Sequence, residues 1–468
     1  MNNHGMNPYL PSWEYIPDGE PHVFGDRVYV YGSHDRFNGY AYCLNDYVCW
    51  SAPVDDLTEW RFDGVIYSRT ADPKNADGKH CLYAPDVTCG PDGRYYLYYC
   101  LDGINVTSVA VSNSPAGPFR YYGDVHHPDG TPYGQASGDG YQFDPAVLID
   151  GESRWLYTGF CPASLKDRTG AQITELASDM LTVLSPAKTI VPSAAHAENT
   201  SFEGHAFFEA SSIRKVNDRY YFIYSSQLSH ELCYSTADMP DGPFVYGGTI
   251  ISNGDVGLTD TPRYFLGNNH GSIEEINGKW YVFHHRHTNG SSYSRQGCME
   301  PIVILPDGSI PQVACTSCGP NGAPLPCKGV FPAYTACHLF LTQPPMVRTD
   351  FGQSPFPRIT QDCADTPDGI GAEPAYIANL TAGVVAGFSY FDCTGIHSIA
   401  VKVRGKSYGC GLQVSLTPDG ESLGIIPVNS SNEWHWDRAE IAIPDGVHAL
   451  YFKVVGFGIF SFSAFELE

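Results

Sequence analysis

Short apolar runs alternate with turns along the whole chain, and no long stretch places apolar residues at helical spacing. Residues 140–160, "GYQFDPAVLIDGESRWLYTGF", show the unit: an apolar run, a turn, a basic residue and an aromatic run. Related units begin at Gly19, Ala84, Glu209 and His270, and their basic residues recur at intervals of 60 to 67 residues. Two such runs around a short turn are typical of a β-hairpin.

A single hairpin cannot bury both of its faces, so repeated hairpins must pack against one another. Five units at this spacing predict five small antiparallel sheets arranged in a ring, a five-bladed β-propeller over residues 1–310. Residues 351–468 again show alternating runs separated by turns, which predicts a β-sandwich. The predicted fold class is therefore all-β.

Residues 311–350 differ from both of these segments and predict a connector rich in Cys, Pro and Gly. Four cysteines fall here, at Cys315, Cys318, Cys327 and Cys337. A zinc knuckle and a disulfide pair are alternatives to the simplest interpretation, an irregular connector with free thiols.

Each predicted hairpin has a polar residue at the start of its first strand. These residues are Glu20, Asp86, Asp144, Glu209 and His270. A propeller lines its central channel with the first strands, so ring closure would bring these side chains to one mouth. Carboxylates placed close together raise one another's pKa, and such strained arrangements are typical of active sites. The alternative is that each acid caps a turn or pairs with an arginine.

Paired carboxylates suit the hydrolysis of glycosidic bonds. An inverting glycosidase places a general acid and a general base roughly 6.5–9.5 Å apart, with a water between the base and the sugar. A third carboxylate can raise the pKa of the acid so that it stays protonated near neutral pH.

Several motifs in order resemble glycoside hydrolase family 43, whose members are five-bladed propellers. They are "NPYLPSWEYIPDGEPHVFGDRVYVYGSHD", "LYAPDV", "FDPAVLID", "FFEASSIRKVNDRYYFIYSS" and "NNHGSIEEINGKWYVFHH", within residues 7–310. The resemblance implies that Glu209 is the general acid and that Asp144 tunes its pKa. It also implies that His270 lies at the base of the channel near a metal ion or a water, so a structural calcium ion is considered there. The expected chemistry needs no cofactor.

One dipeptide departs from the family pattern, which has Asp-Pro where this chain has Glu20-Pro21. Glu20 is favoured as the base. Asp18 is the alternative, because residues two apart share one face of a strand, and a base from elsewhere is a third option. Glu203 is the alternative to Glu209 as the acid.

Further residues are predicted to contact substrate: Asp18, Trp13, Tyr83, Asp86 and Arg295. Aromatic rings bury the C–H faces of sugars, although core packing explains an aromatic residue equally well, and an ion pair within blade five would explain Arg295. The C-terminal segment resembles family 6 carbohydrate-binding modules, with Trp434, Trp436 and Tyr376 as a candidate sugar platform. The alternative is a domain that packs on the propeller and binds nothing.

The expected function is inverting, exo-acting removal of α-L-arabinofuranosyl residues from plant saccharides. β-Xylosidase or exo-β-galactosidase activity and a non-catalytic sugar-binding propeller are the alternatives. The net charge of −24 argues against nucleic acid and anionic membranes as partners. The N-terminus lacks signal-peptide features and no apolar run reaches transmembrane length, which indicates a cytoplasmic protein with reduced thiols, or a secreted one if a signal has been lost.

Overall fold

The computed structural model describes residues 5–342 and 356–468. The elements in these ranges are β-strands and short 3-10 helices, which confirms the all-β prediction. None of the described helices has the length and apolarity needed to cross a membrane.

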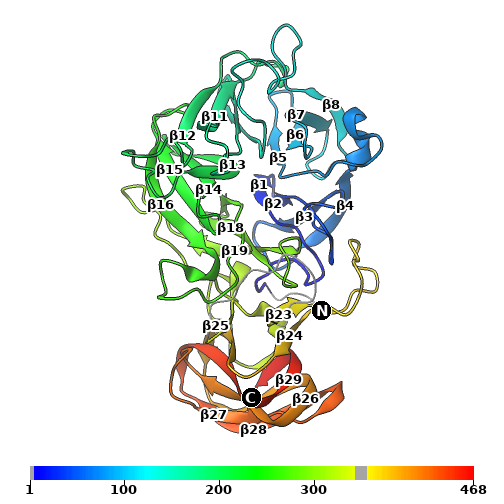
Figure 1. Ribbon diagram of the computed structural model, residues 1–468, viewed down its shortest axis with the longest axis vertical. Helices are drawn as coiled ribbons and strands as arrows, with labels where there is room; N and C mark the ends of the chain where they lie inside the picture. Colours follow the sequence, from blue (N-terminus) through cyan, green and yellow to red (C-terminus); the bar gives the residue numbers. More distant parts are fainter. Residues whose placement is uncertain (1–4, 343–355) are drawn as a thin grey trace.

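Five small antiparallel sheets form a ring, with their inner strands around one axis (Figure 1). The inner strands contact one another in turn, from β1 through β5, β9, β13 and β17 back to β1. The predicted five-bladed propeller is therefore confirmed.

Four blades have four strands each and the fifth has three. Blades one and two comprise β1 (Glu20–Phe24), β2 (Arg27–Tyr31), β3 (Tyr47–Pro53), β4 (Arg61–Tyr67), β5 (Asp86–Cys89), β6 (Tyr95–Cys100), β7 (Thr107–Ser112) and β8 (Arg120–Asp124). Blades three and four comprise β9 (Ala146–Asp150), β10 (Ser153–Thr158), β11 (Gly170–Glu175), β12 (Lys188–Pro192), β13 (Phe207–Val216), β14 (Arg219–Ser226), β15 (Glu231–Ala237) and β16 (Val245–Ser252). Blade five comprises β17 (Ser272–Ile276), β18 (Lys279–His287) and β19 (Arg295–Ile302). The 3-10 helices are η1 (Arg69–Ala71), η2 (Pro73–Asn75), η3 (Asn253–Asp255), η4 (Gly319–Asn321) and η5 (Ala333–Thr335).

Tyrosines fill the spaces between blades, where both faces of a strand are covered. Tyr67 and Tyr99 pack together between blades one and two, and their hydroxyl groups are 2.7 Å apart. The Tyr99 hydroxyl also donates to buried Asp72 at 2.7 Å. A buried tyrosine contributes a large apolar surface but needs a partner for its hydroxyl, and these pairs supply one.

The start of the chain closes the ring by lying along the outer strand of blade five. The Tyr9 amide donates to the Gly297 carbonyl at 3.3 Å. The Asn7 side-chain amide donates to the Met299 carbonyl at 3.0 Å, and its oxygen accepts from the Met299 amide at 2.9 Å. Blade five is therefore joined to a segment nearly 300 residues earlier in the sequence.

The C-terminal part is a curled sheet built around two long strands, β26 (Ile396–Ser415) and β29 (Gly446–Leu467), which pair with each other (Figure 1). Its other strands are β20 (Leu325–Pro326), β21 (Gly329–Pro332), β22 (His338–Leu341), β23 (Arg358–Thr360), β24 (Tyr376–Leu380), β25 (Val384–Cys393), β27 (Gly424–Pro427) and β28 (Ser431–Ile443). One apolar cluster, which includes Phe388, Phe452, Phe462 and Phe465, fills the space enclosed by the sheet.

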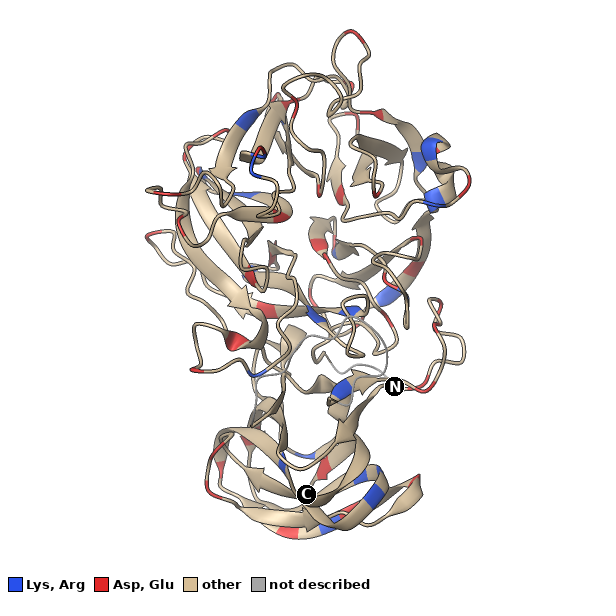
Figure 2. Cartoon of the chain, viewed as in Figure 1, with Lys and Arg blue, Asp and Glu red and all other residues tan. Residues whose placement is uncertain are grey.

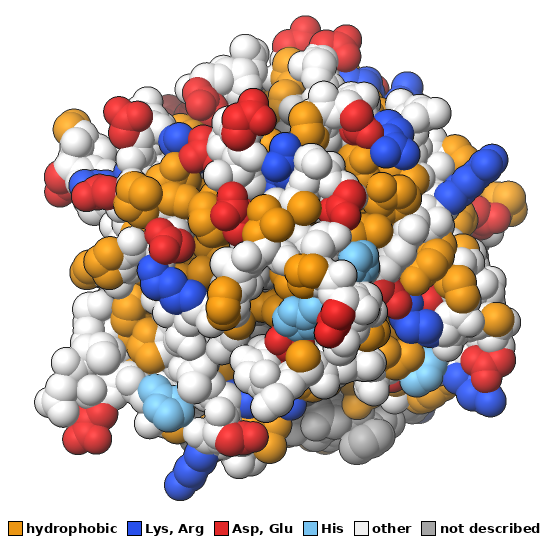
Figure 3. Space-filling view, turned by 90° about the horizontal axis from the view of Figure 1, so that it is seen from above, with side chains coloured by type: hydrophobic (Ala, Val, Ile, Leu, Met, Phe, Trp, Pro, Cys, Tyr) orange, Lys and Arg blue, Asp and Glu red, His pale blue; other side chains and the backbone are white. Residues whose placement is uncertain are grey.

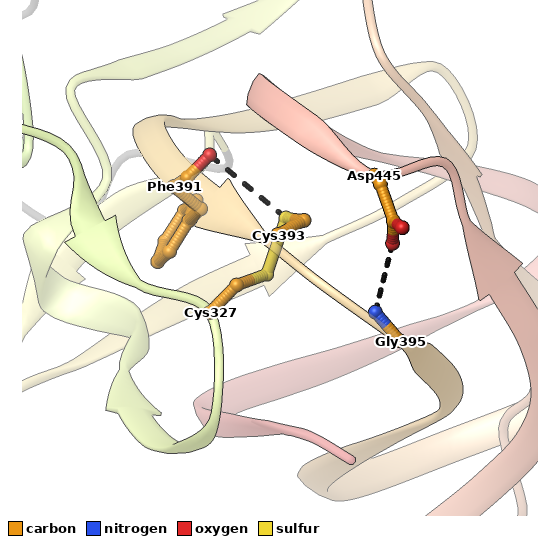
Figure 4. Close-up of a disulfide and its surroundings, with 5 residues drawn as sticks. All are labelled: Cys327, Phe391, Cys393, Gly395 and Asp445. Carbon is orange, nitrogen blue, oxygen red and sulfur yellow. Dashed lines mark hydrogen bonds between the residues drawn. A yellow bond between two sulfur atoms is a disulfide. The ribbon is translucent and has the colours of Figure 1, made fainter.

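The described part of the predicted connector adds strands to this sheet instead of lying apart from it. β20 and β22 pair with β25, and β21 pairs with β29. Cys327 forms a disulfide with Cys393 at the end of β25 (Figure 4), a pairing that the sequence did not predict. The other thirteen cysteines, including Cys315, Cys318 and Cys337, carry no disulfide.

Buried polar contacts join the C-terminal sheet to blade five and its neighbouring loops. Arg286 of β18 donates to the carbonyls of Ala336 (2.7 Å) and Tyr334 (2.5 Å). His338 lies 2.8 Å from Asp255, and both side chains are almost fully buried. The two parts of the molecule therefore share a buried interface.

Candidate active site

A cavity of about 440 Å³ lies at the end of the ring where the inner strands begin. Six of the residues predicted from sequence line it: Asp18, Tyr83, Asp144, Glu209, His270 and Arg295. Figure 2 shows acidic residues on strands near the centre of the ring as well as on outer loops. All five blades contribute to the cavity, because Asp18, Tyr83, Asp144, Glu209 and His270 stand near the start of the five inner strands, while Arg295 begins β19, the outer strand of blade five.

Local backbone geometry aims these side chains into the cavity. Asp18 and Asp144 both adopt positive φ, at 57° and 45°, a conformation that aspartate tolerates better than most residues. Ala210 also has a positive φ of 71°, and the pairing of β13 with β14 shifts register on both sides of Glu209. Such bulges commonly turn a side chain toward an active site, as here for Glu209.

Asp18 is held as a carboxylate chiefly by Arg295 of blade five. Arg295 donates to both Asp18 oxygens at 2.9 and 3.2 Å, and His285 Nδ1 lies 3.3 Å from the nearer oxygen. Burial alone would raise the pKa of Asp18, but Arg295 and the histidines outweigh it and hold the pKa well below its usual range. Asp18 is therefore ionised near neutral pH.

Glu209 has the opposite electrostatic environment. Burial, followed by the negative charge of Asp18, raises the pKa of Glu209 to about 7. Burial and then Glu209 likewise raise the pKa of Asp144 well above its usual value, while a 3.0 Å hydrogen bond from the Ala210 amide acts in the other direction. The cavity thus contains an ionised carboxylate, Asp18, next to two carboxyl groups with raised pKa values, Glu209 and Asp144.

His270 lies between the carboxylates. Its Nδ1 is 3.7 Å from an oxygen of Asp18 and 3.7 Å from an oxygen of Asp144. Burial lowers the pKa of His270 to about 4, so its ring is neutral near pH 7. Calcium takes six to eight oxygen ligands, and these two carboxylate oxygens do not make up such a shell, so a calcium ion here stays a prediction.

Glu20 and Asp86 lie outside the cavity lining, along the inner strands. Arg214 of blade four pairs with Glu20 at 2.7 Å and with Glu274 at 2.8 Å. Asp86 accepts from the Val147 amide at 2.7 Å and lies 2.7 Å from His22. Ligand atoms of Glu20, His22 and Asp86 lie within 4.8 Å of one another, but Arg214 already balances the charge of Glu20. These residues form an ion-pair network that joins the inner strands.

Trp13 also lies outside the cavity. Its ring is 5.8 Å from that of Trp50, within the apolar cluster of blades one and five, and Gly369 of the C-terminal part lies against it. Core packing, the alternative interpretation of this tryptophan, describes its contacts. Arg295 does form ion pairs, but with Asp18 and Asp35 of blade one and not within blade five.

Sequence reasoning missed several residues of the cavity wall. They include Tyr42, Tyr141, Phe143, Phe208, Asp102 and Asn268. Tyr141 and Phe143 flank the strand that begins after Asp144, and Asn268 stands two residues before His270, so proximity to the predicted residues was an available signal. Tyr42 and Asp102 lie on loops, and their approach to the axis depends on tertiary structure.

Comparison with known proteins agrees with this geometry. The sequence pattern of Glycosyl hydrolases family 43 matches residues 16–310. A xylosidase/arabinosidase of Thermoclostridium stercorarium is 58% identical over 100% of this chain and 99% of its own length. A xylosidase/arabinosidase of Bacteroides ovatus is 31% identical, over 59% of this chain and 87% of its own.

Solved structures show the same fold. RS223-Beta-xylosidase superposes with a TM-score of 0.52 at 27% identity, covering 64% of this chain and 96% of its own. An arabinoxylan arabinofuranohydrolase from Bacillus subtilis, 22% identical with a TM-score of 0.53, covers 98% of this chain and 97% of its own, and thus shares the two-part architecture. The chain is a glycoside hydrolase and belongs to Glycosyl hydrolases family 43.

Proposed function

We propose that this enzyme removes terminal α-L-arabinofuranosyl residues from plant saccharides with inversion at the anomeric carbon. One observation carries the proposal: a single cavity holds an ionised carboxylate, Asp18, and a carboxyl group with a pKa near 7, Glu209. They come from blades one and four, which are not neighbours in the ring. Two carboxyl groups with opposite protonation states can act as base and acid on one bond.

The residues would act together in one displacement. Glu209 donates its proton to the leaving oxygen as the bond from that oxygen to the anomeric carbon breaks. Asp18 accepts a proton from the water whose oxygen forms the new bond to the same carbon. Burial and the charge of Asp18 keep Glu209 protonated, Glu209 in turn raises the pKa of Asp144, and Arg295 orients Asp18 through two hydrogen bonds.

We assign the base to Asp18 in place of Glu20, the residue favoured from sequence. Glu20 accepts from Ser212 at 3.0 Å and pairs with Arg214, and it does not line the cavity. A base must reach a water beside the sugar, and proximity to the reacting atoms decides between candidates before pKa does. Asp18, two residues earlier, meets that requirement.

The sugar assignment draws on the relatives. The Thermoclostridium stercorarium relative is named for both xylosidase and arabinosidase activity, and the Paenibacillus polymyxa relative, 24% identical, is an arabinoxylan arabinofuranohydrolase. Both names point to pentoses. α-L-Arabinofuranosyl groups are the first choice and β-D-xylosyl groups the second.

A panel of nitrophenyl glycosides tests the function. We expect turnover of the α-L-arabinofuranoside, weaker turnover of the β-D-xyloside, and release of the inverted anomer when the product is observed by proton NMR within the first minutes. Glu209→Ala should abolish turnover of the α-L-arabinofuranoside. A wild-type enzyme that releases no sugar from any member of the panel, or that retains configuration, would contradict the proposal.

We further propose that the C-terminal sheet binds carbohydrate through Trp436. This side chain is 43% exposed on β28, while Trp434 and Tyr376 are covered by Arg404, which lies 4.4 and 5.0 Å from their rings. Affinity electrophoresis through arabinoxylan tests the assignment: Trp436→Ala should migrate faster than wild type, with unchanged rates on nitrophenyl substrates. Equal retardation of both proteins would contradict the proposal that Trp436 binds carbohydrate.

A further inference from the structure

A second cavity of about 420 Å³ lies in blade three, beside the catalytic cavity. The two cavities share Tyr141 and Phe160, which therefore form a wall between them. The rest of the second lining comes from the loop before β9, from the loop between β10 and β11, from the start of β11 and from Asn105 of blade two. It includes Asp167 and Arg168 of the second loop and Gln172 of β11. Both loops lie at the end of the blade where Asp144 stands.

The polar side chains of this cavity have unused hydrogen-bonding capacity. Arg168 lies 3.7 Å over the ring of Tyr141 and donates to the Phe160 carbonyl at 2.7 Å, but it pairs with no acid among the described residues. Asp167 is exposed and forms no hydrogen bond or ion pair within the described ranges. Gln172 Oε1 is buried and has no hydrogen-bond partner in the described parts of the chain.

This combination suits a sugar more than an ion or an apolar ligand. Carboxylate and guanidinium groups form strong, often bidentate hydrogen bonds, which suit neighbouring hydroxyl groups. An aromatic ring such as that of Phe160, which lines both cavities, buries the C–H face of a pyranose or furanose. The cavity also falls within the range of about 300–1,000 Å³ that is typical of small-molecule sites.

The position of Glu209, the general acid, indicates which part of the substrate could enter the blade-three cavity. Glu209 must contact the leaving oxygen, and its neighbour Phe208 packs against Phe160 at 5.5 Å. Phe160 in turn lines both cavities. A leaving group that is protonated by Glu209 and that extends past Phe160 would enter the blade-three cavity.

We propose that the blade-three cavity binds the saccharide on the leaving-group side of the scissile bond, with Asp167 and Arg168 bonding its hydroxyl groups. The inference rests on the proposed function, because it needs the terminal sugar in the catalytic cavity. It makes these two residues determinants of preference for saccharide over simple aryl leaving groups.

Two kinds of substrate test the inference. Asp167→Asn and Arg168→Ala should lower kcat/KM at least tenfold on an arabinofuranosyl-substituted xylotriose, mainly through KM. On nitrophenyl α-L-arabinofuranoside, whose leaving group is too small to span the wall, the change should stay below threefold. Lys166→Ala, on the same exposed loop but outside the lining, is the matched control and should change neither rate.

The outcomes separate the inference from the function on which it rests. A wild-type enzyme inactive on both substrates contradicts the proposed function. If wild type is active on both substrates, and the variants lose kcat/KM equally on both or on neither, only the assignment of the blade-three cavity is overturned. Calorimetric titration of the substituted xylotriose into Glu209→Gln gives a readout without turnover: adding Asp167→Asn should weaken binding at least fivefold, and unchanged affinity would also overturn the assignment.

Discussion

At the residue scale, neighbouring charges decide what each carboxyl group in the cavity does. Asp18 and Glu209 are both buried, yet Arg295 is bonded to Asp18 and not to Glu209. Their pKa values therefore move in opposite directions. Glu20 also has a guanidinium partner, Arg214, but burial and the charge of Asp86 leave its pKa raised, and it lies outside the cavity lining.

Two isosteric substitutions distinguish the candidate bases. Asp18→Asn should lower kcat by about 10²–10⁴-fold, the usual contribution of general base catalysis. Glu20→Gln should keep kcat within tenfold of wild type but lower the free energy of unfolding by about 3 kcal/mol, because it removes one partner of buried Arg214. Rates on a nitrophenyl glycoside and urea unfolding measure the two effects. The opposite pattern of effects would identify Glu20, and not Asp18, as the general base.

The pH dependence follows from the raised pKa of Glu209. The reaction needs the protonated acid, so kcat/KM should be high below about pH 7 and fall as the pH rises through that value. A hydrogen bond from Asn268 opposes the shift. Asn268→Ala should therefore move the alkaline limb of the kcat/KM profile to higher pH, and a limb that moves to lower pH would contradict this assignment.

At the element scale, the repeat predicted the blades because each hairpin must bury an aromatic strand, and that requirement is visible in a string such as "RYYFIYSS". The leading position of each inner strand predicted Asp144, Glu209 and His270 in the cavity for the same reason. Glu20 and Asp86 show the limit of this reasoning. A polar residue at the start of an inner strand can face either the mouth of the channel or the channel below it. Local backbone geometry, such as the positive φ at Asp18 or the bulge at Glu209, determines which of the two it faces.

The pairing of Cys327 with Cys393 likewise depends on tertiary structure, because β20 meets β25 across 66 residues. Thiol titration of the unfolded, unreduced protein should count thirteen free groups, and fifteen after reduction. Cys393→Ser should lower the free energy of unfolding by about 2–4 kcal/mol, the usual effect of losing such a cross-link. Fifteen thiols before reduction would contradict the bond.

At the scale of the whole molecule, the propeller and the C-terminal sheet are expected to unfold together. Arg286 spans their interface with bonds to two carbonyl groups. Arg286→Met should cost about 2–4 kcal/mol, because hydrogen bonds from a charged group are among the stronger ones. Calorimetry should show one transition for wild type and two for the variant, and two transitions in wild type would contradict the expectation.

No single acidic patch dominates the face of the molecule that is seen in Figure 3. Figure 3 shows acidic side chains spread over one face and interspersed with basic and apolar ones. With a net charge of −24, this distribution favours solubility and disfavours binding to polyanions. It is consistent with a neutral saccharide as the substrate.

The hydrogen bonds between Asn7 and Met299, which join the start of the chain to blade five, have a consequence for biosynthesis. The ribosome synthesises residue 7 long before residue 299. The segment around Asn7 therefore lacks its partner strand in blade five while the first four blades are made. Contacts of such long range slow folding, because the loop they close is entropically expensive. The last blade to be synthesised is therefore the one that locks the ring, and a nascent chain stalled before it would expose two open edges to its neighbours on the polysome.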